Sequence, residues 1–238
     1  MRNSSPARVL VLGFLAIILV GAFFLMLPQA TVGKGLSFLQ ALFTSTSAVC
    51  VTGLVVVDTG TTFTTLGQVI IMLLIQVGGL GFMTMATMIF VAMGKKISFR
   101  SRLLIQESLN QLTLQGMVRF VRGILTYTLI VEGIAAAILG LRFVPQMGWL
   151  RGLYCGIFHS VSAFCNAGFD IMGNYTSLTN YRGDIIVNLT IMALFICGGL
   201  GFTVAEDLSQ NWRKPSRLEF HSKLVLLLTG LLLLSAFL

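Results

Sequence analysis

The chain has 238 residues, of which 56% are hydrophobic and only 10% are charged. Soluble domains carry about 25% charged residues, so this composition excludes a soluble globular domain and predicts an all-α polytopic membrane protein. The net charge of +8 is explained by the lysines and arginines that cytoplasmic loops of membrane proteins carry, so no nucleic-acid partner is expected. The four cysteines lie in apolar surroundings without metal-ligand spacing, as small buried residues do.

The first predicted span is Val9 to Leu27, nineteen almost wholly apolar residues. A helix of this length crosses the roughly 30 Å hydrocarbon core of a bilayer. A cleaved signal peptide is the competing interpretation, but its apolar region is usually about 7–15 residues long, and Pro28-Gln29-Ala30 fits a cleavage site poorly. Pro28 is expected to end the helix.

The next apolar run, Phe38 to Val49, is too short to span the bilayer. Twelve helical residues rise only about 18 Å, so the run is predicted to enter the membrane halfway and turn back. Irregular backbone at membrane depth survives only where it is buried in protein or lines a wet cavity. Since Gly53 follows in an apolar context, this stretch predicts a half-helix followed by a pore loop.

Two further helices and a linker are expected next. Leu66 to Met93 would be about 42 Å long as one helix, so it must tilt, protrude or kink at the glycines of residues 78–81. Residues 95–122 are polar and basic and predict a cytoplasmic linker helix, which lies on anionic lipid, docks an acidic partner or is simply solvated. Gly123 to Leu141 is the third predicted span, which Pro145 is expected to end.

The half-helix pattern recurs 115 positions later, in Leu150 to Met172. The matched pairs are Phe43 and Phe158, Ser45 and Ser160, Ser47 and Ser162, Ala48 and Ala163, Cys50 and Cys165, and Gly53 and Gly168. A second block repeats 120 positions apart, as IQVGGLGF at 75–82 and FICGGLGF at 195–202. Internal repeats of a membrane unit, with the site at the repeat interface, are typical of transport proteins.

Ile185 to Ala205 is the fourth predicted span, and the apolar run Leu224 to Leu238 follows a second basic segment. The expected organisation is a first span–pore-loop–span repeat over 1–94, the linker helix over 95–122, a second repeat over 123–208, a cytoplasmic linker over 209–223, and the start of a third repeat over 224–238 of a longer chain. Of the 16 lysines and arginines, twelve lie on the side of the N-terminus and linkers. That side is therefore expected to face the cytoplasm, and the half-helices to enter from outside.

The ends of the two half-helices predict a cation site. The C-terminal end of a helix carries a partial negative charge, and an ascending loop can offer carbonyl oxygens in place of the ion's water shell. Such a loop needs a residue that tolerates positive φ, and Gly53 and Gly168 occupy matching positions. The alternative is that both are structural turn glycines. The candidate ligand segments are Cys50, Val51, Thr52 and Gly53 in the first loop, and Cys165, Asn166, Ala167 and Gly168 in the second.

These segments resemble the Ktr/Trk/HKT superfamily of potassium transporters. The resemblance is carried by Ser47-Ala48 to Val51-Thr52-Gly53-Leu54, by Ser162 to Phe169 and by the two GGLGF blocks. The VVDTG after the first loop and the LNQLT of the linker are most similar to the bacterial Ktr membrane subunits. The resemblance implies four such units around one pseudo-symmetric pore, of which this chain holds the N-terminal part, although the usual channel sequence TVGYG is absent.

The resemblance also implies a function and partners. It implies potassium uptake, passive or linked to sodium, across the bacterial cytoplasmic membrane, with potassium at Val51, Thr52 and Gly53 and at Asn166, Ala167 and Gly168. It further implies a homodimer bound to a cytoplasmic nucleotide-binding ring, through which ATP, ADP or NAD would regulate the pore. The alternative from another class is a non-conducting membrane scaffold, which would not need a glycine at the turn of each half-helix.

Several other residues are candidates for chemistry. Glu132 lies mid-span and is either a hydrogen-bonded structural group or a proton or sodium relay, and His159 either supports the filter from behind or acts directly in gating or ion binding. Ser160 and Ser162 near His159 suggest a hydrolase, but the G-x-S-x-G elbow is absent and no enzyme is expected. The GGLGF blocks lie inside spans, which favours packing glycines over a phosphate-binding loop.

Overall fold

The computed structural model describes residues 6–33, 35–81, 84, 117–211 and 213–237. Within these ranges the secondary structure is helical, apart from one isolated β-bridge between Thr31 and Phe63. The predicted all-α class is therefore confirmed for the described part of the chain.

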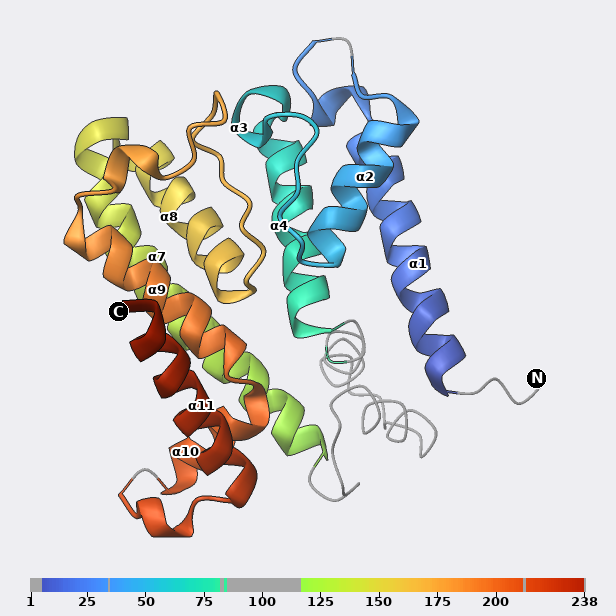
Figure 1. Ribbon diagram of the computed structural model, residues 1–238. Helices are drawn as coiled ribbons and strands as arrows, with labels where there is room; N and C mark the ends of the chain where they lie inside the picture. Colours follow the sequence, from blue (N-terminus) through green and yellow to red (C-terminus); the bar gives the residue numbers. More distant parts are fainter. Residues whose placement is uncertain (1–5, 34, 82–83, 85–116, 212, 238) are drawn as a thin grey trace.

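The first group of helices, blue to teal in Figure 1, consists of α1 (Pro6–Leu25), α2 (Phe38–Val49), the short α3 (Thr59–Thr62) and α4 (Thr65–Leu80), with a 3-10 turn at Pro28–Ala30. The half-helix α2 has the predicted bounds. It begins at a capping box in which the Ser37 hydroxyl accepts from the Gln40 N–H and the Gln40 side chain accepts from the Ser37 N–H. These bonds satisfy two N–H groups that a helix start leaves without a partner.

The second group, green to orange in Figure 1, consists of α7 (Met117–Met147), α8 (Trp149–Phe164) and α9 (Ile185–Gly199), with a 3-10 turn at Thr179–Tyr181. It is followed by α10 (Phe202–Asn211), a 3-10 turn at Pro215–Arg217 and α11 (Phe220–Phe237). In both groups an ascending loop therefore follows the second of the main helices, α2 or α8, and leads to the third, α4 or α9 (Figure 1).

Two of the described helices are long and apolar enough to cross a membrane, over Arg8–Leu25 and Arg119–Met147. The bent pair α9 and α10 is a third candidate. The helix α2 is shorter: its 12 residues rise about 18 Å, less than the thickness of the hydrocarbon core. This agrees with the predicted half-helix.

The third predicted span is longer than expected. The sequence predicts Gly123 to Leu141 with an end at Pro145, whereas α7 runs on to Met147 and contains Pro145. Proline has no N–H and removes one helical hydrogen bond. Pro145 lies in the last turn, and the Gly148 N–H that follows it still donates to the Val144 carbonyl at 2.8 Å.

The predicted fourth span, Ile185 to Ala205, is wrong as a continuous helix. The axes of α9 and α10 differ by 99°. The break lies at Gly201, whose φ of 88° is a left-handed conformation that glycine adopts without steric cost. The matching Gly81 of the first block has a φ of 78° and directly follows the end of α4, at the predicted kink.

Two predicted elements lie outside the described residues. They are the end of the second helix up to Met93 and most of the linker helix predicted over 95–122. The last residues of that linker, 117–122, are not a separate element, because they form the start of α7. The segment 209–223, predicted as a linker, contains the end of α10, a 3-10 turn and the first residues of α11, which begins at Phe220 rather than at Leu224.

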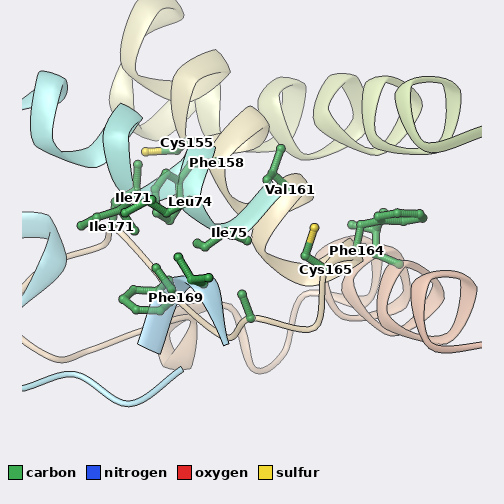
Figure 2. Packing of buried hydrophobic residues seen from close by; sticks show 14 of the residues in the cluster. Ile71, Leu74, Ile75, Cys155, Phe158, Val161, Phe164, Cys165, Phe169 and Ile171 are labelled. Carbon is green, nitrogen blue, oxygen red and sulfur yellow. The ribbon is translucent and has the colours of Figure 1, made fainter. Parts of the chain in front are cut away.

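The buried core joins the two groups of helices (Figure 2). Ile71 and Ile75 of α4 lie in one cluster with Phe158 of α8 and Phe169 of the loop that follows it. In lipid, such side-chain packing is a main contribution to helix association. The core therefore fixes α4 of the first group against the half-helix of the second.

Serine hydroxyls tie each half-helix to the first helix of its own group. Ser45 donates to the Ile18 carbonyl and Ser160 donates to the Glu132 carbonyl, both at 2.7 Å. Ser45 and Ser160 are one of the matched pairs, so the two half-helices are held in the same way.

Candidate ion-binding site

The two half-helices end in the same backbone geometry. Cys50 caps α2 and Cys165 caps α8, with φ angles of −83° and −73°. Three matched hydrogen bonds of 2.8 to 3.3 Å close each end. The N–H groups of Cys50, Val51 and Thr52 donate to the carbonyls of Thr46, Ala48 and Ser47, and those of Cys165, Asn166 and Ala167 donate to Val161, Ala163 and Ser162.

The first residue after each cap is left-handed, with φ of 57° at Val51 and 58° at Asn166. The sequence does not predict this for both loops. Asparagine visits the left-handed region readily and is a common residue after a helix end, so Asn166 is the one available signal. A β-branched valine is an outlier there, and Val51 therefore carries strain of about 1–3 kcal/mol.

Gly53 and Gly168 are left-handed as predicted, with φ of 72° and 73°. Their surroundings differ: a Cβ at Gly53 would overlap the carbonyl oxygen of Ala167, whereas a Cβ at Gly168 would meet only the Gly53 Cα, at 3.9 Å. The two ascending loops thus meet where Gly53 faces the Ala167 carbonyl. The structure brings the two predicted segments together.

Exposure separates the residues of the two segments. Cys50, Thr52, Asn166 and Gly168 are exposed, Val51 and Gly53 are half-buried, and Cys165 and Ala167 are buried. More exposed and less exposed residues therefore alternate along each segment. Cys165 points its thiol toward α4.

The first glycine of each GGLGF block packs against the end of a half-helix. A Cβ at Gly78 would overlap the Val49 carbonyl, and a Cβ at Gly198 would overlap the Phe164 carbonyl. Val49 and Phe164 are the last residues of α2 and α8. The predicted packing role of these glycines is therefore confirmed, since they lie inside α4 and α9 against neighbouring backbone.

Side-chain hydrogen bonds brace both loops from behind. Thr52 donates to the Ser47 hydroxyl at 2.9 Å in the first loop. In the second, Ser162 donates to the Phe169 carbonyl at 2.7 Å, and the Asn166 amide donates to the Phe164 carbonyl at 3.3 Å. The loops share a backbone course but are held by different side chains.

Asp58 connects the two groups of helices where the loops emerge. One oxygen of its buried carboxylate accepts from the Thr61 N–H at 2.8 Å and caps α3, and the other accepts from the Tyr175 N–H in the second group. Gly60 and Gly173 lie so close that a Cβ at Gly60 would be 2.6 Å from the Gly173 nitrogen. Burial raises the pKa of Asp58, but the hydrogen bonds from Tyr175 and Thr61 outweigh it and hold the pKa below its ordinary value.

The stability of the protein should therefore depend on Asp58 in acid. A carboxyl group whose pKa is lowered on folding contributes stability above its unfolded pKa of about 3.9, and that contribution is lost as the pH falls through the folded pKa. We expect the unfolding temperature of the intact protein in detergent to fall more steeply between about pH 5 and 3 than that of the Asp58→Asn variant. Parallel pH curves for the two proteins would contradict this role of Asp58.

His159 lies behind the second loop rather than along it. Its ring is 2% exposed and makes edge contacts with Phe143 and Phe158, each with centroids 5.9 Å apart. Because the Cys155 carbonyl can only accept, the Nδ1 atom of His159, 2.7 Å away, carries the proton of this hydrogen bond. This placement favours the predicted supporting role over direct ion binding.

Glu132 is also placed behind the loops, at the contact between α7 and α4. Its side chain is 7% exposed and accepts from the Gln76 amide at 3.0 and 3.2 Å. Gln76 was not among the sequence candidates, and nothing in the repeat marks it, since Ile196 stands at the matching position 120 residues later.

The hydrolase interpretation finds no support in the geometry. Ser160 and Ser162 both donate to backbone carbonyls, and His159 bonds to its own helix. Over the described ranges, no group of three His, Cys, Asp or Glu side chains could hold a metal ion.

The chain is similar to known cation transport proteins. The family model of TrkH, described as "Cation transport protein", matches residues 9–238. The chain is 50% identical over 98% of its length to Ktr system potassium uptake protein B of Bacillus subtilis, and 44% identical over 95% to the protein of the same name in Vibrio alginolyticus. It is 40% identical over 99% to the potassium/sodium uptake protein NtpJ of Enterococcus hirae.

The chain spans about half the length of each of these relatives, 51%, 50% and 52%. The matched model nevertheless covers nearly all of the chain, and this family consists of transporters rather than enzymes, as expected. The predicted resemblance to the Ktr/Trk superfamily is therefore confirmed: this chain belongs to the TrkH family of membrane cation transport proteins.

Proposed function

We propose that this chain contributes two of the four segments of a potassium filter, and that the intact protein takes up potassium across the bacterial cytoplasmic membrane. The ion would exchange part of its water shell for backbone carbonyls of residues 50–53 and 165–168. Each segment lies at the C-terminal end of a half-helix, whose partial negative charge favours a cation.

The meeting of the two loops carries this proposal. Two segments 115 residues apart share the same three closing hydrogen bonds and the same two left-handed positions, and they touch at Gly53 and Ala167. Two merely structural turns would have no reason to converge. The names of the similar proteins support potassium, and that of the Enterococcus protein supports sodium as a second ion.

Several wider features belong to the same proposal. Two further span–pore-loop–span repeats would complete the ring of carbonyls, and the N-terminus and linkers would face the cytoplasm. Uptake would be passive or linked to sodium. The intact protein would form a homodimer gated by a cytoplasmic nucleotide-binding ring, in keeping with relatives that are named as parts of a Ktr system.

Flux through purified protein tests the proposal. The intact protein, reconstituted in liposomes, should pass potassium faster than sodium in at least one of two conditions, in the presence or in the absence of its cytoplasmic partner. A homogeneous, folded protein that passes neither ion in both conditions would instead favour the non-conducting scaffold.

Asn166→Ala should lower the apparent affinity for potassium while leaving the amount of assembled protein nearly unchanged. The Asn166 amide holds the second loop to the Phe164 carbonyl, and loss of one such hydrogen bond is worth about 1 kcal/mol, or about fivefold in affinity. The measurement is the potassium concentration that gives half-maximal uptake, with assembled protein quantified by size-exclusion chromatography.

The alternative is that Asn166 coordinates the ion through its side chain, and Asn166→Asp separates the two roles. A carboxylate ligand would strengthen potassium binding, whereas a carboxylate at a bracing position lacks the N–H donors that the Phe164 carbonyl needs. We expect weaker binding. Tighter binding by the aspartate variant would show that Asn166 is a ligand.

A further inference from the structure

We propose that Gln76, on α4 of the first group, is a positioning residue for the filter segment of the second group. It rests on the function proposed above and adds a residue that lies outside both filter segments. The side chain of Gln76 reaches across the contact between the two groups and touches both a buried carboxyl group and the cap of the second half-helix.

The first contact fixes Gln76 to α7. Its Nε2 atom donates to both oxygens of Glu132, at 3.0 and 3.2 Å. Glu132 is itself joined to α8, because its backbone carbonyl accepts from the Ser160 hydroxyl at 2.7 Å. One amide therefore links α4 to the pair of helices that carries the second loop.

The second contact is with the residue that starts the second filter segment. The Sγ atom of Cys165 lies 3.9 Å from the Oε1 atom of Gln76, within the longer range of a sulfur donor. One turn further along α4, Gly79 leaves the space that Cys165 occupies, since a Cβ there would be 2.6 Å from its Cβ and Sγ atoms. The amide and the glycine together form a socket on α4 for the Cys165 side chain.

The socket matters for the second filter segment because Cys165 lies at the start of that segment. Cys165 caps α8 and directly precedes the left-handed Asn166, so a shift of Cys165 moves the first carbonyls of the segment. Figure 2 places Cys165 beside Phe164, at the end of the core that α4 and α8 share. The carbonyls of the second loop are thus held partly from the first group.

This arrangement is not part of the repeat. The position that matches Gln76 is occupied by Ile196, and Ile18 supplies the carbonyl that corresponds to that of Glu132. Cys50, which matches Cys165, is exposed rather than buried. The contact between the first and second groups therefore has a polar link of its own. In a filter built from several loops, the position of each loop along the pore must be fixed relative to the others. The Gln76 link fixes the position of the second loop relative to the first group of helices.

A reciprocal exchange of the two side chains separates positioning from simple packing. Gln76→Glu places two carboxyl groups in contact and should break the link, and Gln76→Leu removes the amide. The double variant Gln76→Glu with Glu132→Gln restores an amide–carboxyl pair, and the new carboxyl at position 76 still offers an acceptor to Cys165. The exchanged pair of side chains in the double variant has the same total volume as the parent pair, so packing is preserved.

The readouts are the ratio of potassium to sodium flux of the intact protein in liposomes and the rate at which a thiol reagent modifies Cys165 in a Cys50→Ser background. We expect each single Gln76 variant to lower the flux ratio about fivefold and to raise the Cys165 rate by a similar factor. The half-buried Cys197 of α9 serves as the internal reference, because its rate should not change.

The double variant should return both readouts to parental values. Parental flux ratios and Cys165 rates in both Gln76→Glu and Gln76→Leu would overturn the inference, as would a double variant that remains as defective as Gln76→Glu. Absence of potassium-selective flux in the parent protein would overturn the proposed function instead, and the thiol rates would still decide whether Gln76 holds Cys165.

Discussion

Gly53→Ala should remove most of the preference of the intact protein for potassium over sodium, whereas Gly168→Ala should reduce it much less. Both glycines are left-handed, with φ of 72° and 73°, so a side chain costs each of them about 1–2 kcal/mol of conformational strain. Only Gly53 adds a steric conflict, because its Cβ would overlap the Ala167 carbonyl oxygen. The substitution therefore pushes the two loops apart at the point where they meet.

The comparison of these two variants isolates the steric effect from the strain that they share. Potassium uptake across a titration of competing sodium gives the preference, and stabilisation of the purified protein by added potassium gives binding independently of flux. We expect about a five- to 30-fold loss for Gly168→Ala from strain alone and a larger loss for Gly53→Ala. Equal losses, or a larger loss at Gly168, would mean that the approach of the two loops does not set selectivity.

Gly198→Ala should destabilise the intact protein strongly, whereas its neighbour Gly199→Ala should not. The Cβ at Gly198 would overlap the carbonyl of Phe164, the last residue of α8, so α9 or the end of the half-helix must move. Overpacking of this kind typically costs about 1–3 kcal/mol and sometimes more. At Gly199 the Cβ would meet only the Asn166 amide nitrogen at 3.7 Å, an ordinary contact.

The two substitutions make the same chemical change at adjacent positions of one helix, so helix propensity cancels. Alanine favours the helix over glycine by about 1 kcal/mol, and Gly199→Ala should therefore be neutral or slightly stabilising. Thermal unfolding of the purified protein in detergent measures both. If Gly198→Ala unfolds at the parental temperature, the close packing of α9 on the half-helix does not contribute to stability.

Local features of this fold could be predicted because each depends on the residues of one short stretch of sequence. The length of the apolar run predicts α2 from Phe38 to Val49, and the repeat over 115 positions predicts the second half-helix. The left-handed conformations of Gly53 and Gly168 follow from their matching positions. The GGLGF blocks lie in apolar runs, which is why their packing role could be predicted without a partner helix in view.

Contacts between the two groups could not be predicted, because they depend on how the groups are placed in space. Nothing local marks Gln76 as the partner of Glu132 or Tyr175 as the partner of Asp58. The two wrong helix ends have a different cause. Pro145 and Gly201 are both residues that interrupt helices, and their effect depends on whether the interruption falls in a last turn or in the middle of an expected span.

The left-handed valine after the first half-helix should make the two loops unequal in their fluctuations. Asn166 suits its conformation, whereas Val51 is held against a strain of about 1–3 kcal/mol, which corresponds to about a five- to 150-fold bias toward local opening. That strain is released as soon as the three closing hydrogen bonds of the first loop give way. When no ion is bound to the carbonyls, transient rearrangements of the loop backbone should therefore begin around Val51, while the loop around Asn166 keeps its conformation.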